Sequence, residues 1–121
     1  MKSACLIPAP RCGYAGPGVE GHHVLGRDAA GAYVKPEIIL PLCDRWDGCH
    51  QAGIHRLLRA QGLDGPMAPT LGVLLGRIAV TLGYVGLART GSVLVPSAFL
   101  ADTADVLAPI GYALRQLEHR P

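Results

Sequence analysis

The sequence predicts a small α+β protein, in which a strand, a loop, a second strand and a helix precede a helical hairpin. Two short apolar segments, residues 19–25 and 38–42, are bounded by glycine or proline and are typical of strands. Residues 49–60 have the length and composition of a helix, which Gly62 and Pro66 end. The 121 residues suffice for one domain and are too few for two ordinary ones.

Composition favours an aliphatic core between many turns. Half of the residues are hydrophobic but aromatics make up only 5%, and there are 16 glycines and 10 prolines. A unit of this kind often needs a disulfide bond or a bound metal ion to stabilise it. The formal net charge of +2 permits a nucleic-acid partner without arguing for one, although the excess of arginine over lysine suits phosphate contacts.

The chain divides by character into a unit over residues 1–64 and an apolar half over residues 65–121. Residues 70–87 are almost wholly apolar, with Arg77 as the single charge, and a second helix is expected over residues 98–118. The two form a predicted hairpin linked through residues 91–95. Its apolar, glycine-containing faces exceed what so small a first unit needs to cover, so a homodimer through the hairpin is a hypothesis.

The apolar stretch has a second interpretation as a membrane span, because it is nearly long enough to cross a bilayer. Arg77 would then lie near the middle of the bilayer, at a cost of about 2.5–3.5 kcal/mol on the insertion scale. We therefore prefer a soluble helix without a membrane partner. The first eight residues contain no long apolar run and predict no secretory signal, which places the protein in the cytoplasm.

Four cysteines form two pairs, Cys5 with Cys12 and Cys43 with Cys49, with six and five residues inside them. In the cytosol such cysteines are expected as thiolate ligands rather than disulfides. Four thiolates would hold one structural Zn²⁺ and tie the N-terminal loop to the turn before the helix. The loops are wider than the usual two to four residues, and the alternative is four buried cysteines that pack as small hydrophobic side chains.

Four of the five histidines lie near these cysteines: His22 and His23 at the end of the first strand, His50 and His55 on the helix. Adjacent strand residues point to opposite faces, so His22 and His23 are expected to have different roles. His50 and His55 stand five residues apart and would diverge by about 140° on a regular helix. Gly53 marks a turn or a one-residue bulge that restores their convergence; otherwise His55 faces a phosphate or merely packs.

These motifs together resemble the HNH endonuclease family, most of all its small phage and actinobacterial members. The resemblance rests on His-His-Val followed by Gly-Arg, on Pro-Glu-x-x-x-Pro-Leu-Cys, and on Gly-Cys-His followed by Ile-His, in that order, over about half of the chain. It implies a ββα-metal unit that hydrolyses DNA phosphodiester bonds with a divalent ion (Mg²⁺, Mn²⁺, Ni²⁺ or Zn²⁺). Several relatives in that family carry a similar four-cysteine zinc knuckle.

The resemblance implies a role for each histidine. His22 matches the family's first metal ligand, His23 its general base and His50 its helix ligand, while His55 is expected as the third ligand of the catalytic ion. Each histidine alone would be taken as a satisfied surface or core residue, but four in this order favour a metal site. His119, near the C-terminus, is predicted to be solvated.

Two features depart from the family pattern. The Asn that usually fixes the loop carrying the general base falls on Ile38, so either catalysis is weakened or the loop is held otherwise, by Glu37 or by Asp28. The second departure is the five-residue spacing between His50 and His55. A catalytically weakened, zinc-stapled DNA-binding or assembly module is therefore the alternative to an active nuclease.

Two arginines near the histidines are predicted to contact DNA phosphates. Arg27 follows the first strand and Arg56 follows His55 directly. The alternative is that both face solvent, as most exposed arginines do. Nothing in the sequence predicts base-specific contacts, so weak sequence preference is expected.

Overall fold

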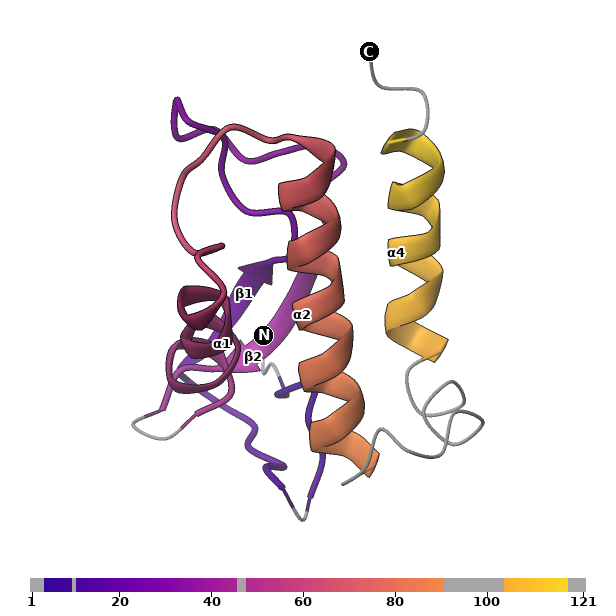
Figure 1. Ribbon diagram of the computed structural model, residues 1–121. Coiled ribbons are helices and arrows are strands. Elements are labelled where there is room, and N and C mark those ends of the chain that lie inside the picture. Colours follow the sequence, from indigo (N-terminus) through magenta and orange to yellow (C-terminus); the bar gives the residue numbers. More distant parts are fainter. Residues whose placement is uncertain (1–3, 10, 46–47, 91–103, 118–121) are drawn as a thin grey trace.

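A computed structural model describes residues 4–9, 11–45, 48–90 and 104–117, and they form a mixed α and β structure as predicted (Figure 1). Two strands form an antiparallel sheet, and short and long helices pack beside it. The elements, in chain order, are β1 (Val19–His23), β2 (Ile39–Cys43), η1 (His50–Ile54), α1 (His55–Ala60), α2 (Leu71–Thr90) and α4 (Ala104–Leu117).

The sheet pairs β1 with β2 so that Val19 lies opposite Cys43 and His23 opposite Ile39. Leu40 is buried and its neighbour Ile39 is exposed, as expected for a strand with one face on the core. Strand β1 ends two residues before the predicted end, because Gly26 adopts a φ of +70° and turns the chain away. The strand positions predicted from the hydrophobic pattern are otherwise correct within two residues.

The loop between the strands is fastened by Asp28. Its carboxylate accepts hydrogen bonds from the backbone N–H groups of Ala30 at 2.9 Å and Ala32 at 3.0 Å. Glu37, in contrast, is exposed and pairs with Lys35 at 3.1 Å. Of Asp28 and Glu37, Asp28 is therefore the acid that holds this loop, while Ile38 lies buried in the core.

Helix α2 connects the two halves of the chain. It packs against η1 and α1 on one side and against α4 on the other (Figure 1). The buried aliphatic core draws on both halves and includes Ile7, Leu40, Leu42, Ile54, Leu74, Val85 and Ile110. The second predicted helix is present as α4, with Pro109 inside it, whereas the predicted link over residues 91–95 lies outside the described residues.

By length and composition, α2 is long and apolar enough to cross a membrane over Leu71–Ala88. The single charge within Leu71–Ala88, Arg77, is only 2% exposed and packs against the first unit. The guanidinium donates hydrogen bonds to the backbone carbonyls of Leu25, Leu63 and Gly65. Backbone oxygens thus satisfy the buried charge.

Candidate metal centre

Three histidines from three different elements meet at one point. His22 comes from β1, His50 is the first residue of η1 and His55 is the first residue of α1. The ring centroids of His22 lie 5.3 Å from His50 and 4.9 Å from His55, and those of His50 and His55 lie 4.6 Å apart. One ligand nitrogen of each lies within 4.8 Å of the others, so these residues could hold one ion.

The chain between His50 and His55 is a π-helical turn. The N–H groups of Ile54 and His55 donate to the carbonyls of Cys49 and His50, five residues back instead of four. The wider turn places residues five apart on the same face, and the two Nε2 atoms lie 3.1 Å apart. Two nitrogens about 2.0–2.1 Å from one tetrahedral zinc would be separated by roughly 3.3 Å, so this spacing suits a shared ion.

Three ring nitrogens of this cluster lack hydrogen-bond partners. Both ring nitrogens of His22 and Nδ1 of His50 are buried and unpaired, and Nδ1 of His50 approaches Asp44 only to 3.5 Å. Burial, and then the neighbouring His55 and His50, lower the pKa of His22 to about 3. Burial also lowers the pKa of His50. Both rings are therefore neutral near pH 7, the form that binds metal ions.

A carboxylate orients the third imidazole. Oδ1 of Asp64 lies 2.7 Å from Nδ1 of His55, and its other oxygen lies 3.4 Å from Arg59. Burial acts to raise the pKa of Asp64, but the hydrogen bond and charge of His55 outweigh it and lower that pKa. Sequence reasoning did not find Asp64; the only signal was an acid in the glycine-bounded turn that follows the helix.

A cavity of roughly 320 Å³ opens over the cluster. Its lining includes all three histidines of the cluster and also His23, Arg27, Tyr33, Asp64 and Arg77. The second histidine of the strand doublet thus borders the same space as the other three. The exposed Arg56 lies on α1 and does not line the cavity, so the structure brings only one of the two predicted phosphate contacts to it.

His23 is held by an aromatic contact that the sequence did not reveal. Its ring stacks on Tyr33, with centroids 3.6 Å apart and planes within 8°. Arg27 lies over the same tyrosine ring at 4.0 Å and donates to its hydroxyl at 2.6 Å. Burial lowers the pKa of His23, although Glu37 opposes that effect. The imidazole is therefore neutral near pH 7 and restrained at the edge of the cavity.

The four cysteines form a second cluster. One sulfur atom from each lies within 4.8 Å of the others, and all four are free of disulfides. Sγ of Cys12 lies 3.5 Å from Sγ of Cys43, which accepts the N–H of Cys49 at 3.3 Å. Such a set of thiols could hold a metal ion such as zinc, as the sequence predicts.

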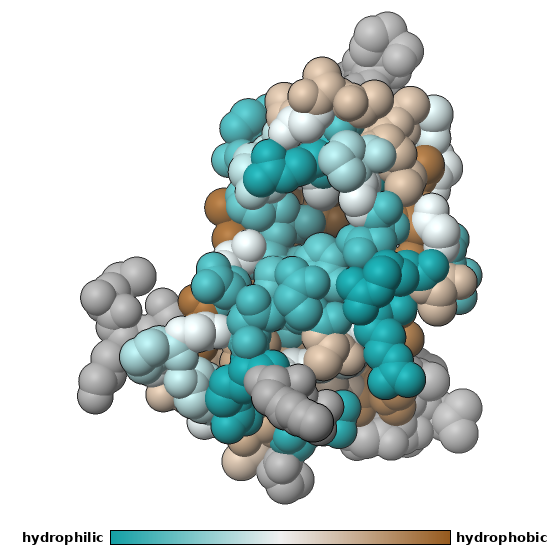
Figure 2. All heavy atoms as spheres, turned by 90° about the vertical axis from the view of Figure 1, so that its left-hand side faces the viewer, coloured by the Kyte–Doolittle hydropathy of each residue, from teal (hydrophilic) through white to brown (hydrophobic). Residues whose placement is uncertain are grey.

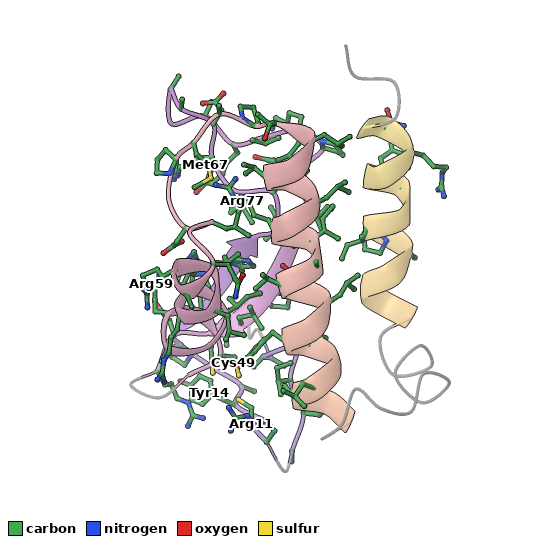
Figure 3. All side chains as sticks on the ribbon, viewed as in Figure 1. Arg11, Tyr14, Cys49, Arg59, Met67 and Arg77 are labelled. Atoms are coloured by element: carbon green, nitrogen blue, oxygen red, sulfur yellow. The ribbon has the colours of Figure 1, made fainter. Side chains whose placement is uncertain are left out.

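The two clusters adjoin through consecutive residues, Cys49 and His50. Figure 3 shows Cys49 and Tyr14 toward the lower end of this region and Arg77 toward the upper end, with Arg59 on the outer side of α1. Burial raises the pKa of Cys49, while backbone and side-chain hydrogen bonds outweigh burial and lower that of Cys43 to about 7. A bound cation would stabilise all four thiolates together.

The chain matches no protein-family model, no curated protein and no solved structure. Its likeness to HNH endonucleases therefore rests on the sequence motifs quoted above. The structure adds the two clusters and the cavity that the four histidines line.

Proposed function

We propose that the chain is a metal-dependent HNH-type endonuclease that hydrolyses phosphodiester bonds in DNA. The observation that carries this proposal is the set of three convergent imidazoles with unpaired buried nitrogens, beside a fourth imidazole that borders the same cavity. The order strand, loop, strand and helix supports the ββα-metal unit of this proposal.

In this proposal His22, His50 and His55 hold the divalent ion. Three imidazoles leave one coordination position open, as in catalytic zinc sites, and nitrogen donors suit Zn²⁺ or Ni²⁺ better than Mg²⁺. When bound, the ion would supply positive charge that stabilises the charge developing on the phosphate and the departing 3′ oxygen.

His23 acts as the general base that takes a proton from the attacking water. Its lowered pKa leaves the ring unprotonated near pH 7, so it can accept that proton. The stack on Tyr33 restrains the ring plane. Asp28 fixes the loop that follows, which compensates for Ile38 at the family's Asn position.

DNA would approach over the face that carries η1 and α1. Figure 2 shows that this face is largely hydrophilic. Arg27 borders the cavity and is our candidate for a contact with the phosphate next to the scissile bond. Arg56 lies outside the cavity on the exposed side of α1, where a contact would reach a more distant phosphate. The family resemblance implies 5′-phosphate and 3′-hydroxyl ends.

The second candidate function is a zinc-stapled DNA-binding or assembly module that has lost cleavage. Ile38 favours it, because a buried isoleucine makes none of the hydrogen bonds expected of the family's Asn. The four-cysteine cluster would serve such a module equally well.

Plasmid nicking with Mg²⁺, Mn²⁺, Ni²⁺ and Zn²⁺ separates the two functions. We expect the wild type to nick DNA, and His23→Ala to lose about 10²–10⁴-fold in rate, the usual contribution of a general base, while it keeps its metal content and fold. His119→Ala, the same change near the C-terminus of the sequence, serves as the control. Full activity in His23→Ala would refute its role, and DNA binding without nicking by the wild type would favour the module.

A further inference from the structure

Asp64 makes a shorter contact with the three-histidine cluster, at 2.7 Å, than Asp44 makes, at 3.5 Å. Its Oδ1 lies 2.7 Å from Nδ1 of His55, a short contact between two partly buried groups. Nε2 of the same ring faces Nε2 of His50 at 3.1 Å. The two ring nitrogens of His55 thus face different partners, one anionic and one a potential fellow ligand.

The backbone around Asp64 is clamped by Arg77 from α2. Nε of Arg77 donates to the carbonyl of Leu63 at 3.1 Å and Nη2 donates to that of Gly65 at 2.6 Å, so the residues on both sides of Asp64 are held. Nη1 donates to the carbonyl of Leu25, two residues beyond His23. One buried guanidinium therefore ties the turn that carries Asp64 to the end of the strand that carries the histidine doublet.

We propose that Asp64 is a positioning residue that fixes the tautomer of His55. The carboxylate accepts a hydrogen bond from Nδ1–H, which leaves the Nε2 lone pair directed at the shared ion. The negative charge of Asp64 also makes that imidazole a stronger donor to a cation. This inference rests on the metal site of the proposed function, and it gives the apolar second half of the chain a role, because Arg77 holds Asp64 in place.

A merely structural ion pair between Asp64 and His55 would predict a different result. Its loss would lower stability but would leave the relative affinity for a metal ion unchanged. The metal affinity is therefore the decisive measurement, and the tautomer shows how Asp64 acts on it.

The affinity test uses full-length protein that carries one equivalent of Zn²⁺ in the four-cysteine cluster. Co²⁺ is then titrated as the second equivalent and followed by its visible absorption, which lacks thiolate charge-transfer bands when only imidazoles bind. We expect Asp64→Ala to weaken Co²⁺ binding about 10–100-fold and Asp64→Asn, which keeps an acceptor oxygen but loses the charge, to weaken it less. Glu37→Gln removes a carboxylate charge away from the cluster and should change the affinity less than threefold.

Ring ¹⁵N NMR of the protein without the second metal ion reads the tautomer independently of cleavage. We expect the Nδ1–H form of His55 in the wild type and in Asp64→Asn, and its loss in Asp64→Ala. Wild-type Co²⁺ affinity together with an unchanged tautomer in Asp64→Ala would overturn the proposal. If Co²⁺ binding and its dependence on Asp64 are present but no DNA is cut, the nuclease assignment fails and the role of Asp64 stands.

Discussion

His50 and His55 have their Nε2 atoms 3.1 Å apart although they stand five positions apart in the chain. A regular helix would turn their side chains about 140° away from each other. The π-helical turn over His50–Ile54 removes that divergence, since its hydrogen bonds span five residues. Such single turns are frequent at functional sites, and here the turn aims a second imidazole at the first.

Gly53 should be required for this turn. A Cβ at Gly53 would lie 2.6 Å from the hydroxyl oxygen of Tyr84 and 2.9 Å from its Cζ, so Gly53→Ala must displace a buried tyrosine. We expect a loss of about 1–3 kcal/mol in the free energy of unfolding, measured by urea denaturation. Gly83→Ala is the matched control, because a Cβ there meets nothing within 4 Å on the exposed side of α2. It should stabilise the protein by about 0.5–1 kcal/mol. Equal stability of Gly53→Ala and wild type would show that the turn tolerates a side chain.

The element order could be predicted from the sequence because it depends on local patterns. Apolar runs bounded by glycine and proline gave both strands within two residues, and strand alternation separated the roles expected for His22 and His23. The four cysteines and three of the histidines were predicted as two metal sites from residue type, order and the family resemblance, and the structure brings the members of each set together.

The residues that support the site could not be predicted, because their roles arise from contacts distant in the chain. Arg77 donates a hydrogen bond to the carbonyl of Leu25, 52 positions away in the chain. In the sequence, Arg77 served only as an argument against a membrane span. Tyr33 contacts His23 only because the loop between the strands folds back on it. Asp64 contacts His55 only because α1 places His55 next to the turn that follows the helix. The π turn was equally hidden, since a spacing of five residues fits both convergence and divergence.

Removal of one thiolate should release one metal ion and leave the other site filled. Cys49 lies in the four-cysteine cluster and directly precedes His50, so Cys49→Ser tests whether the two clusters bind separately. We expect two equivalents of divalent metal per chain in the wild type supplied with Zn²⁺ and about one in the variant, by elemental analysis after gel filtration. Unfolding at a lower denaturant concentration should accompany the loss, because structural zinc stabilises small folds. One equivalent in the wild type would mean that only one cluster binds zinc.

Arg77→Met should destabilise the protein more than the loss of any exposed charge. The variant leaves the carbonyls of Leu25, Leu63 and Gly65 without their donor in a buried place. We expect a loss of about 2–4 kcal/mol in the free energy of unfolding, from guanidinium denaturation. Arg56→Met, an equivalent change on the exposed side of α1, should stay within about 0.5 kcal/mol of wild type. If Arg77→Met lost no more stability than Arg56→Met, solvent would have to reach the three carbonyls.

The free energy of unfolding should decrease as the pH is lowered, and His22 should account for part of this decrease. In the folded state, burial and the neighbouring histidines lower its pKa to about 3, whereas the ordinary value of 6.5 applies when the chain is unfolded. Between these values the unfolded chain binds more protons, so acidification favours unfolding, with a slope of up to about 1.4 kcal/mol per pH unit from this residue.

His22→Asn should therefore reduce the slope of unfolding free energy against pH between pH 6.5 and 5, measured by urea denaturation at fixed ionic strength. His50 and the cysteines are present in both proteins, so the difference between the two slopes isolates His22. Near pH 7.5 His22 is unprotonated in both the folded and the unfolded protein, so the slopes of the wild type and the variant should converge there. Identical slopes for the wild type and His22→Asn at pH 5–6.5 would mean that His22 takes up a proton in the folded protein as easily as in water. The histidine cluster would then have to open before His22 is protonated.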